Sequence, residues 1–98
     1  MVVYKYKLST HIEATLMLPK GAQVLRVDVQ KGTMFLWAMV DPDAEKEARV
    51  FDIFGTGSPI PDFNRRFINT FFTHDGGTYV FHAFERIHPN NPSASSNS

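Results

Sequence analysis

The chain has 98 residues, a length that fits one domain and leaves little room for a second. Hydrophobic residues make up 43% and charged residues 20%, a globular balance, and ten basic against ten acidic residues give no net charge. This neutrality argues against nucleic acid or an anionic membrane as the chief partner, and the absence of cysteine excludes disulfides and thiolate zinc sites. Neither a signal peptide nor a membrane-spanning segment is expected.

The first half of the chain predicts four β-strands, because apolar residues alternate with polar ones and turn residues separate the runs. The expected strands are residues 2–8, 12–18, 24–29 and 33–40. In the first strand Lys5 and Lys7 lie opposite the apolar face, and we interpret them as guards of a sheet edge.

Lys31-Gly32 predicts a two-residue turn between the third and fourth strands. Such a turn gives the hairpin one apolar face for the core, with Leu25 opposite Ala38 at its far end. The other face mixes charges with large apolar side chains, namely Arg26, Asp28, Phe35, Trp37 and Met39. Either a neighbouring segment covers these rings and Arg26 lies on Trp37, or the face is open to a partner. We expect partial exposure of Trp37 and take this face as the candidate binding surface.

The second half of the chain predicts three further strands, residues 48–54, 67–73 and 78–85. A charged run after Asp41 could form one short helix near residues 42–48. Residues 88–98 are rich in Asn, Pro and Ser and offer little apolar area, so we expect a single β domain over residues 1–87 and a flexible tail. Seven short strands predict a small, mainly antiparallel sandwich or barrel, and the alternative is an α+β fold with that helix.

The last two strands should form a hairpin, because Asp75-Gly76 is a strong turn signal. A two-residue loop there would place Asn69 opposite His82, as a polar pair framed by aromatic residues. We interpret this pair as a satisfied hydrogen bond within the core, with a ligand-binding pair as the alternative.

The run Gly55-Thr56-Gly57-Ser58 has the glycine-rich composition of a phosphate-binding loop, and Arg65 and Arg66 follow it. It lacks the lysine of a P-loop and the spacing of a dinucleotide-binding fingerprint. We therefore interpret it first as a structural loop that needs glycine for its backbone angles, and keep an anion- or ligand-binding role as the alternative.

No set of side chains for acid-base or nucleophilic catalysis can be assembled from the sequence, and the four histidines lack metal-ligand spacing. We accordingly expect no enzymatic activity, no catalytic residues, no metal and no cofactor.

Six segments in order are spread along nearly all of the chain before the tail: Tyr4-Lys5-Tyr6, Leu18-Pro19-Lys20-Gly21-Ala22, Phe35-Leu36-Trp37-Ala38-Met39-Val40-Asp41-Pro42, Gly55-Thr56-Gly57-Ser58-Pro59-Ile60-Pro61, Thr70-Phe71-Phe72 and Val80-Phe81-His82-Ala83-Phe84-Glu85. Together they resemble a family of small proteins encoded by tailed bacteriophages, and the third and fourth segments are the most specific. The family often has His where Ser58 stands, which puts any role of a histidine there in doubt. The resemblance implies a phage origin and brings no established activity.

Phages commonly use small accessory proteins to bind and redirect host machinery. The expected function is therefore non-enzymatic binding of a bacterial host protein, in transcription or defence, within the host cytoplasm. The alternatives are a small-molecule binder that sequesters a nucleotide signal and a minor virion or assembly component. The sequence indicates neither the host target nor the oligomeric state.

Overall fold

A computed structural model gives the fold of the protein and describes residues 1–8, 12–62, 64–73 and 79–87. These residues form seven strands and no helix: β1 (Val2–Lys7), β2 (Glu13–Pro19), β3 (Gln23–Gln30), β4 (Thr33–Val40), β5 (Lys46–Gly55), β6 (Arg65–Thr73) and β7 (Tyr79–Arg86). Every expected strand is present, and the ends differ from the predicted ones by at most two residues.

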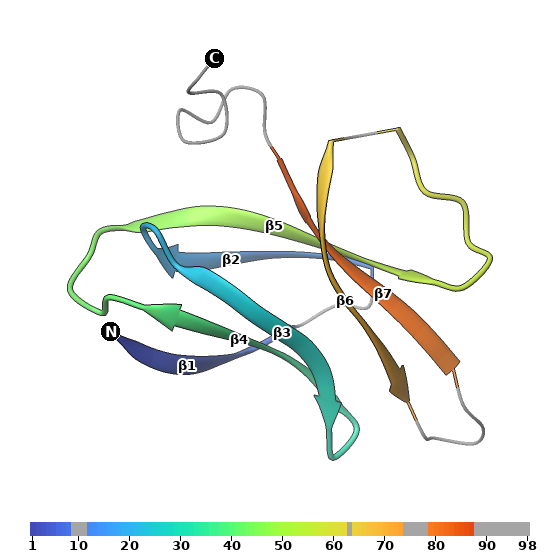
Figure 1. The fold of residues 1–98 in the computed structure, drawn as a ribbon, viewed down its shortest axis with the longest axis horizontal. Coiled ribbons are helices and arrows are strands. Elements are labelled where there is room, and N and C mark those ends of the chain that lie inside the picture. The colour runs from blue at the N-terminus through green and yellow to red at the C-terminus, as the bar shows by residue number, and fades with distance from the viewer. Residues whose placement is uncertain (9–11, 63, 74–78, 88–98) are drawn as a thin grey trace.

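The strands form two antiparallel sheets of a small β-sandwich (Figure 1). Sheet A has three strands in the order β1-β4-β3, and sheet B has four in the order β2-β5-β7-β6. The chain crosses from one sheet to the other after β1, β2 and β4, whereas β3–β4 and β6–β7 are hairpins within a sheet. The predicted small antiparallel β domain is confirmed.

The segment between β4 and β5 forms a turn, and the short helix expected near residues 42–48 is wrong. The N–H of Ala44 donates to the C=O of Asp41, and the N–H of Asp43 donates to the Asp41 carboxylate, both at 3.1 Å. The charged residues that follow belong to β5, whose first residue, Lys46, pairs with Pro19 of β2. Pairing across the sheet thus overrides a weak local helix tendency.

The β3–β4 hairpin turns at the predicted residues, Lys31 and Gly32, whose φ values are 52° and 78°. Two successive positive φ angles are typical of a type I′ turn, whose twist suits a two-residue hairpin loop. The predicted register holds from this turn as far as Arg26, which pairs with Trp37.

Beyond Arg26 the predicted register is wrong, because β3 contains a bulge at Leu25. The extra residue moves Val24, rather than Leu25, opposite Ala38. Leu25 is therefore not a core residue, and 43% of its surface is exposed.

The β6–β7 hairpin also differs from the prediction, since Asn69 pairs with Ala83 and not with His82. The register is shifted by one residue in the half nearer the turn, and the predicted turn at Asp75-Gly76 lies outside the described residues. A bulge at Ile68 offsets the shift in the far half. The expected Asn69–His82 pair is therefore wrong, and the two side chains have different partners.

Alternate residues of both sheets point into one apolar core. The largest fully buried side chains are Leu18, Val27, Leu36, Val40, Phe51 and Phe71. The core thins toward β1, where the inward-facing side chains of Val2 and Tyr4 remain 40% and 46% exposed.

One side chain joins sheet A to sheet B between the edge strands β3 and β6. Asn69 Oδ1 accepts a hydrogen bond from the N–H of Val27, and Asn69 Nδ2 donates to the C=O of Val27, both at 2.8 Å. The amide thus reproduces the two bonds that an adjacent strand would make to this residue. We call this contact between Asn69 and Val27 the Asn69 clasp.

Candidate functional site

The outer surface of sheet A brings together all five predicted binding residues. Leu36 and Ala38 of β4 are completely buried, so the residues between and beside them point away from the core. Their partners on β1 and β3 share this direction, because directly paired residues lie on the same face of a sheet. We call this surface the Trp37 face; it consists of Val3, Lys5 and Lys7 of β1, Gln23, Arg26, Asp28 and Gln30 of β3, and Thr33, Phe35, Trp37 and Met39 of β4.

The centre of the Trp37 face is a row of half-buried apolar side chains on β4: Phe35, Trp37 and Met39. The rings of Phe35 and Trp37 contact each other, with centroids 6.1 Å apart and planes tilted by 57°. Lys5 Nζ lies 4.5 Å from the centroid of the Phe35 ring. Trp37 is therefore partly exposed, as expected, and is held by neighbours on the same sheet.

An ion pair borders this row on β3. Arg26 Nε lies 3.0 Å from Asp28 Oδ2, and the two side chains are 55% and 32% exposed. Asp28 Oδ1 also accepts a hydrogen bond from the N–H of Val29 at 2.8 Å, which fixes the carboxylate. The face thus presents both signs of charge next to aromatic surface, an arrangement found at protein–protein interfaces.

The glycine-rich loop is a tight turn packed on sheet B. The N–H of Ser58 donates to the C=O of Gly55 at 3.0 Å, and Gly57 has a φ of 90°, as a type II turn requires at its third residue. The N–H of Thr56 donates to the C=O of Val80 at 3.1 Å. Two of the N–H groups that could cradle a phosphate are thus bonded within the protein.

Arg65 and Arg66 do not converge on one site, because successive residues of β6 point to opposite faces of sheet B. Arg65 donates to Asp52 at 2.9 Å and to the C=O of Pro61 at 2.7 Å, and 5% of its side chain is exposed. The Arg66 side chain is 65% exposed, and its guanidinium lies 3.8 Å from Glu85.

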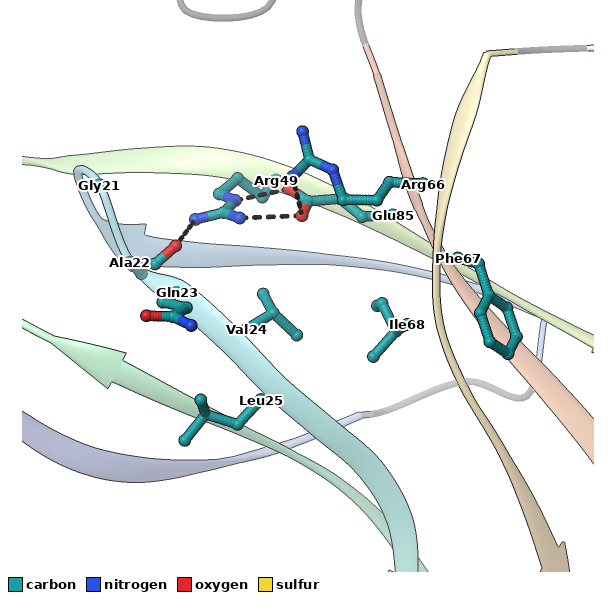
Figure 2. Close-up of a pocket in the computed structure, with 10 residues that line it drawn as sticks. All are labelled: Gly21, Ala22, Gln23, Val24, Leu25, Arg49, Arg66, Phe67, Ile68 and Glu85. Atoms are coloured by element: carbon teal, nitrogen blue, oxygen red, sulfur yellow. Dashed lines mark hydrogen bonds and ion pairs between the residues drawn. The ribbon is translucent and has the colours of Figure 1, made fainter.

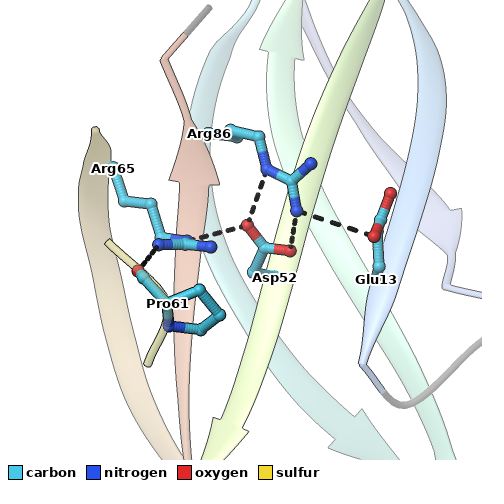
Figure 3. A network of polar contacts seen from close by, with 5 residues as sticks. All are labelled: Glu13, Asp52, Pro61, Arg65 and Arg86. Atoms are coloured by element: carbon cyan, nitrogen blue, oxygen red, sulfur yellow. Dashed lines mark hydrogen bonds and ion pairs between the residues drawn. The ribbon is translucent and has the colours of Figure 1, made fainter. Parts of the chain in front are cut away.

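Asp52 is the centre of a buried charge network on the outer side of sheet B (Figure 3). Arg65 bonds one carboxylate oxygen, and Arg86 Nη2 bonds the other at 2.7 Å. The hydrogen bond to Asp52 raises the pKa of Arg86. Because Arg65 also holds Pro61, the network fastens the segment before β6 to the sheet, which indicates a structural role.

His82 lies on the same side of sheet B, between two threonine hydroxyls. Its Nδ1 is 2.9 Å from Thr70 Oγ1, and its Nε2 is 2.8 Å from Thr56 Oγ1. Both ring nitrogens therefore have partners, which fits the interpretation of His82 as a satisfied polar group. Its partner is not Asn69, however, and the half-buried ring lies on the outer side of the sheet and not within the core.

A pocket of about 400 Å³ lies between β3 and β6, beside the Asn69 clasp (Figure 2). Val24 and Ile68 point into it from the two strands. On one wall Arg49 donates to Glu85 at 2.8 Å and to the C=O of Ala22 at 2.6 Å, and the bond to Glu85 raises the pKa of Arg49. The buried charges of the pocket are thus bonded to the protein itself.

Sequence reasoning missed Asn69 as the link between sheets and Asp52 as a network centre. Asp52 did carry a signal, because it stands among Val50, Phe51, Ile53 and Phe54, where a carboxylate needs a buried partner.

Within the described ranges no group of three His, Cys, Asp or Glu side chains could hold a metal ion. No helix of the described part is long and apolar enough to cross a membrane.

Comparison with known proteins gives a family for this fold. No curated protein and no solved structure matches the chain. The family described as "Domain of unknown function (DUF7352)" matches residues 1–94, a span that includes all seven strands. The chain therefore belongs to the DUF7352 family.

Proposed function

We propose that this protein is a non-enzymatic binding module that recognises another protein through the Trp37 face. The observation that carries the proposal is the row of Phe35, Trp37 and Met39, half-buried on a sheet surface and bordered by an exposed ion pair. Trp, Met and Arg are enriched at protein interfaces, and Trp and Arg most often dominate the binding energy.

The chemistry of the face favours a protein partner over nucleic acid. Arg26 is paired with Asp28, and Lys5 donates to Gln30 at 3.0 Å, so two of the three cations of the face, the third being Lys7, already have partners on the protein. Binding to a phosphate backbone depends on cations that replace counterions, and this chain has no net positive charge. A protein surface with both signs of charge around an apolar centre suits this face better.

We further propose that the protein is encoded by a phage and that the partner is a bacterial host protein of transcription or defence, bound in the host cytoplasm. The support for this part is the resemblance of the sequence to small phage proteins. Sequestration of a nucleotide signal is less favoured by the geometry, because Thr56 and Ser58 use their N–H groups internally and Arg65 is committed to Asp52.

The test is affinity capture from bacterial lysate with the wild-type chain, Trp37→Ala and a matched control, Phe72→Ala. Phe72 is also an aromatic strand residue, 52% exposed, but it lies on sheet B. We expect a stoichiometric protein band with the wild type and the control that is lost with Trp37→Ala. Capture that is equal for all three chains, co-purification of a nucleotide instead of a protein, or incorporation of the chain into virions would contradict the proposal.

A further inference from the structure

The edge of sheet A at β1 has backbone groups available for pairing. Among the strands that the structure describes, only β4 pairs with β1 (Figure 1). The N–H of Leu8, directly after β1, donates to Met34 at 3.0 Å, in the same register as the strand. Since backbone direction alternates along a strand, Val3, Lys5 and Lys7 direct their N–H and C=O groups toward the open side.

The side chains beside this edge are apolar and exposed on both faces of the sheet. Val2 and Tyr4, on the inner face, are 40% and 46% exposed, and Val3, on the outer face, is 55% exposed. An open strand edge with exposed apolar side chains favours pairing with another chain.

Lys5 does not protect this edge, which corrects its interpretation as an edge guard. Its Nζ bonds Gln30 of β3 at 3.0 Å and lies over Phe35 of β4. The side chain thus extends across sheet A, away from the open side of β1. Lys7, the other expected guard, is exposed at the last residue of β1, and its role as a guard stays a prediction.

The sequence of β1 is complementary to itself in one antiparallel register. With Tyr4 opposite Tyr4 of a second copy, Val3 lies opposite Lys5 and Val2 lies opposite Tyr6. Val3 and Lys5 are residues whose backbone groups face the open side, so they form the hydrogen-bonded pairs. A register centred on Lys5 instead opposes two lysines, which is unfavourable, and one centred on Val3 pairs fewer residues.

We propose that two copies of this chain form a two-fold symmetric dimer by antiparallel pairing of their β1 edges in the register centred on Tyr4. The two copies of sheet A then make one continuous sheet. Because paired residues share a face, both Trp37 faces lie on the same side of that sheet, which doubles the proposed recognition surface. This inference does not depend on the identity of the partner of the Trp37 face.

The first test is sedimentation of the full chain over a range of concentrations, with Val3→Lys and Val3→Glu. Each substitution places its charge in the pair with Lys5 of the second copy, whose exposed side chain must turn from Gln30 to meet it, on both sides of the two-fold axis. We expect Val3→Lys to weaken the dimer about tenfold and Val3→Glu to strengthen it. A chain that stays monomeric at about 1 mM, a concentration that detects even weak association, or equal effects of the two substitutions would overturn the proposal.

The second test uses the absence of cysteine from the chain. In this register the two Tyr4 Cα atoms are about 4.5 Å apart, within the usual disulfide range of about 4.4–6.8 Å. Tyr4→Cys should therefore form a covalent dimer on mild oxidation. Val2→Cys is the matched control, because its two copies are separated by about 13 Å along the strands. Equal cross-linking of the two variants would contradict the register. The result is independent of the proposed function, because the effect of Trp37→Ala on partner capture does not change the cross-linking expected of either cysteine variant.

Discussion

A single substitution at Asn69 tests how much the Asn69 clasp, the link between the two sheets, contributes to stability. Asn69→Ala removes both 2.8 Å bonds and leaves the N–H and C=O of Val27, a completely buried residue, without these partners. An unsatisfied buried backbone group costs about 1–3 kcal/mol, so the two together should cost about 2–4 kcal/mol after some rehydration. For a domain of this size each kcal/mol lowers the melting temperature by about 4–8 °C, which predicts a loss of at least about 8 °C.

Thermal unfolding of Asn69→Ala and Asn69→Asp checks this reasoning. A protonated carboxyl offers one donor and one acceptor, like the amide, whereas a carboxylate offers acceptors only. Ionisation of the introduced carboxyl beside the C=O of Val27 is disfavoured in the folded state, so its stabilising contribution is present at low pH and lost as the pH rises. The deficit of Asn69→Asp relative to wild type should therefore be smaller near pH 4 than at pH 7. A shift below about 3 °C for Asn69→Ala, under 1 kcal/mol, would refute the account of the clasp.

Three further substitutions and one deletion have expected outcomes in thermal unfolding, and the pairing of Arg86 has an expected pH dependence. Gly57→Val should destabilise the domain by at least about 1 kcal/mol, because φ is 90° there. Gly55→Ala should be tolerated, since its new Cβ would come no closer than 3.6 Å to another atom. Equal melting temperatures of the two variants would contradict this difference. Asp52→Ala should cost about 3–5 kcal/mol by removing the buried carboxylate that two arginines share, although Arg86 keeps its ion pair with Glu13, and a neutral result would show that the network is dispensable. Because the pKa of Arg86 is raised, the contribution of its charge to stability is present at every pH below the ordinary arginine range near 12 and is lost only above that range. This contribution to the free energy of unfolding should therefore not vary between about pH 5 and 9. Deletion of residues 90–98 should leave the melting temperature nearly unchanged, and a loss of several degrees would show that the tail contributes to the fold.

In the first hairpin the register could be predicted near the turn but not beyond the bulge at Leu25. Lys31-Gly32 has the chemistry of a two-residue turn, and the turn fixes every pair near it. The bulge at Leu25 has no comparable local signal, since Leu25 and Val24 are equally apolar. It lies on the edge strand beside β6, and bulges are common at sheet edges, but the sequence does not indicate which strand is the edge.

The predictions for the second hairpin and for the region after β4 were wrong for different physical reasons. Asp75-Gly76-Gly77 is compatible with loops of two or three residues, and a difference of one residue exchanges every predicted pair near the turn. The charged run within residues 42–48 has residues that suit a short helix, but Lys46 and Glu47 pair with β2, and this pairing decides their conformation. That pairing is a long-range contact with no trace in the local pattern.

The candidate site shows the same contrast between local contacts, which the sequence indicates, and long-range contacts, which it does not. The residues of the Trp37 face could be grouped from alternation within one hairpin, because local pairing determines that surface. Asn69 and Asp52 act through residues distant in the sequence, Val27 and Arg86, and such partners become apparent only when the fold is known. Composition left an anion-binding role of the glycine-rich loop open beside a structural one, because composition does not reveal that the N–H groups of Thr56 and Ser58 bond the protein itself.

The central claim, recognition of a protein through the Trp37 face, is tested most directly by exchanging the charges of its exposed ion pair. A variant with both Arg26→Asp and Asp28→Arg keeps an ion pair within the chain but reverses its polarity toward a partner. Calorimetric titration of the captured partner should show binding at least about tenfold weaker than with wild type, because charges that matched the partner now oppose it. The melting temperature should change by only a few degrees, since the pair is exposed and contributes at most about 1 kcal/mol. Unchanged affinity of this folded variant would contradict the account.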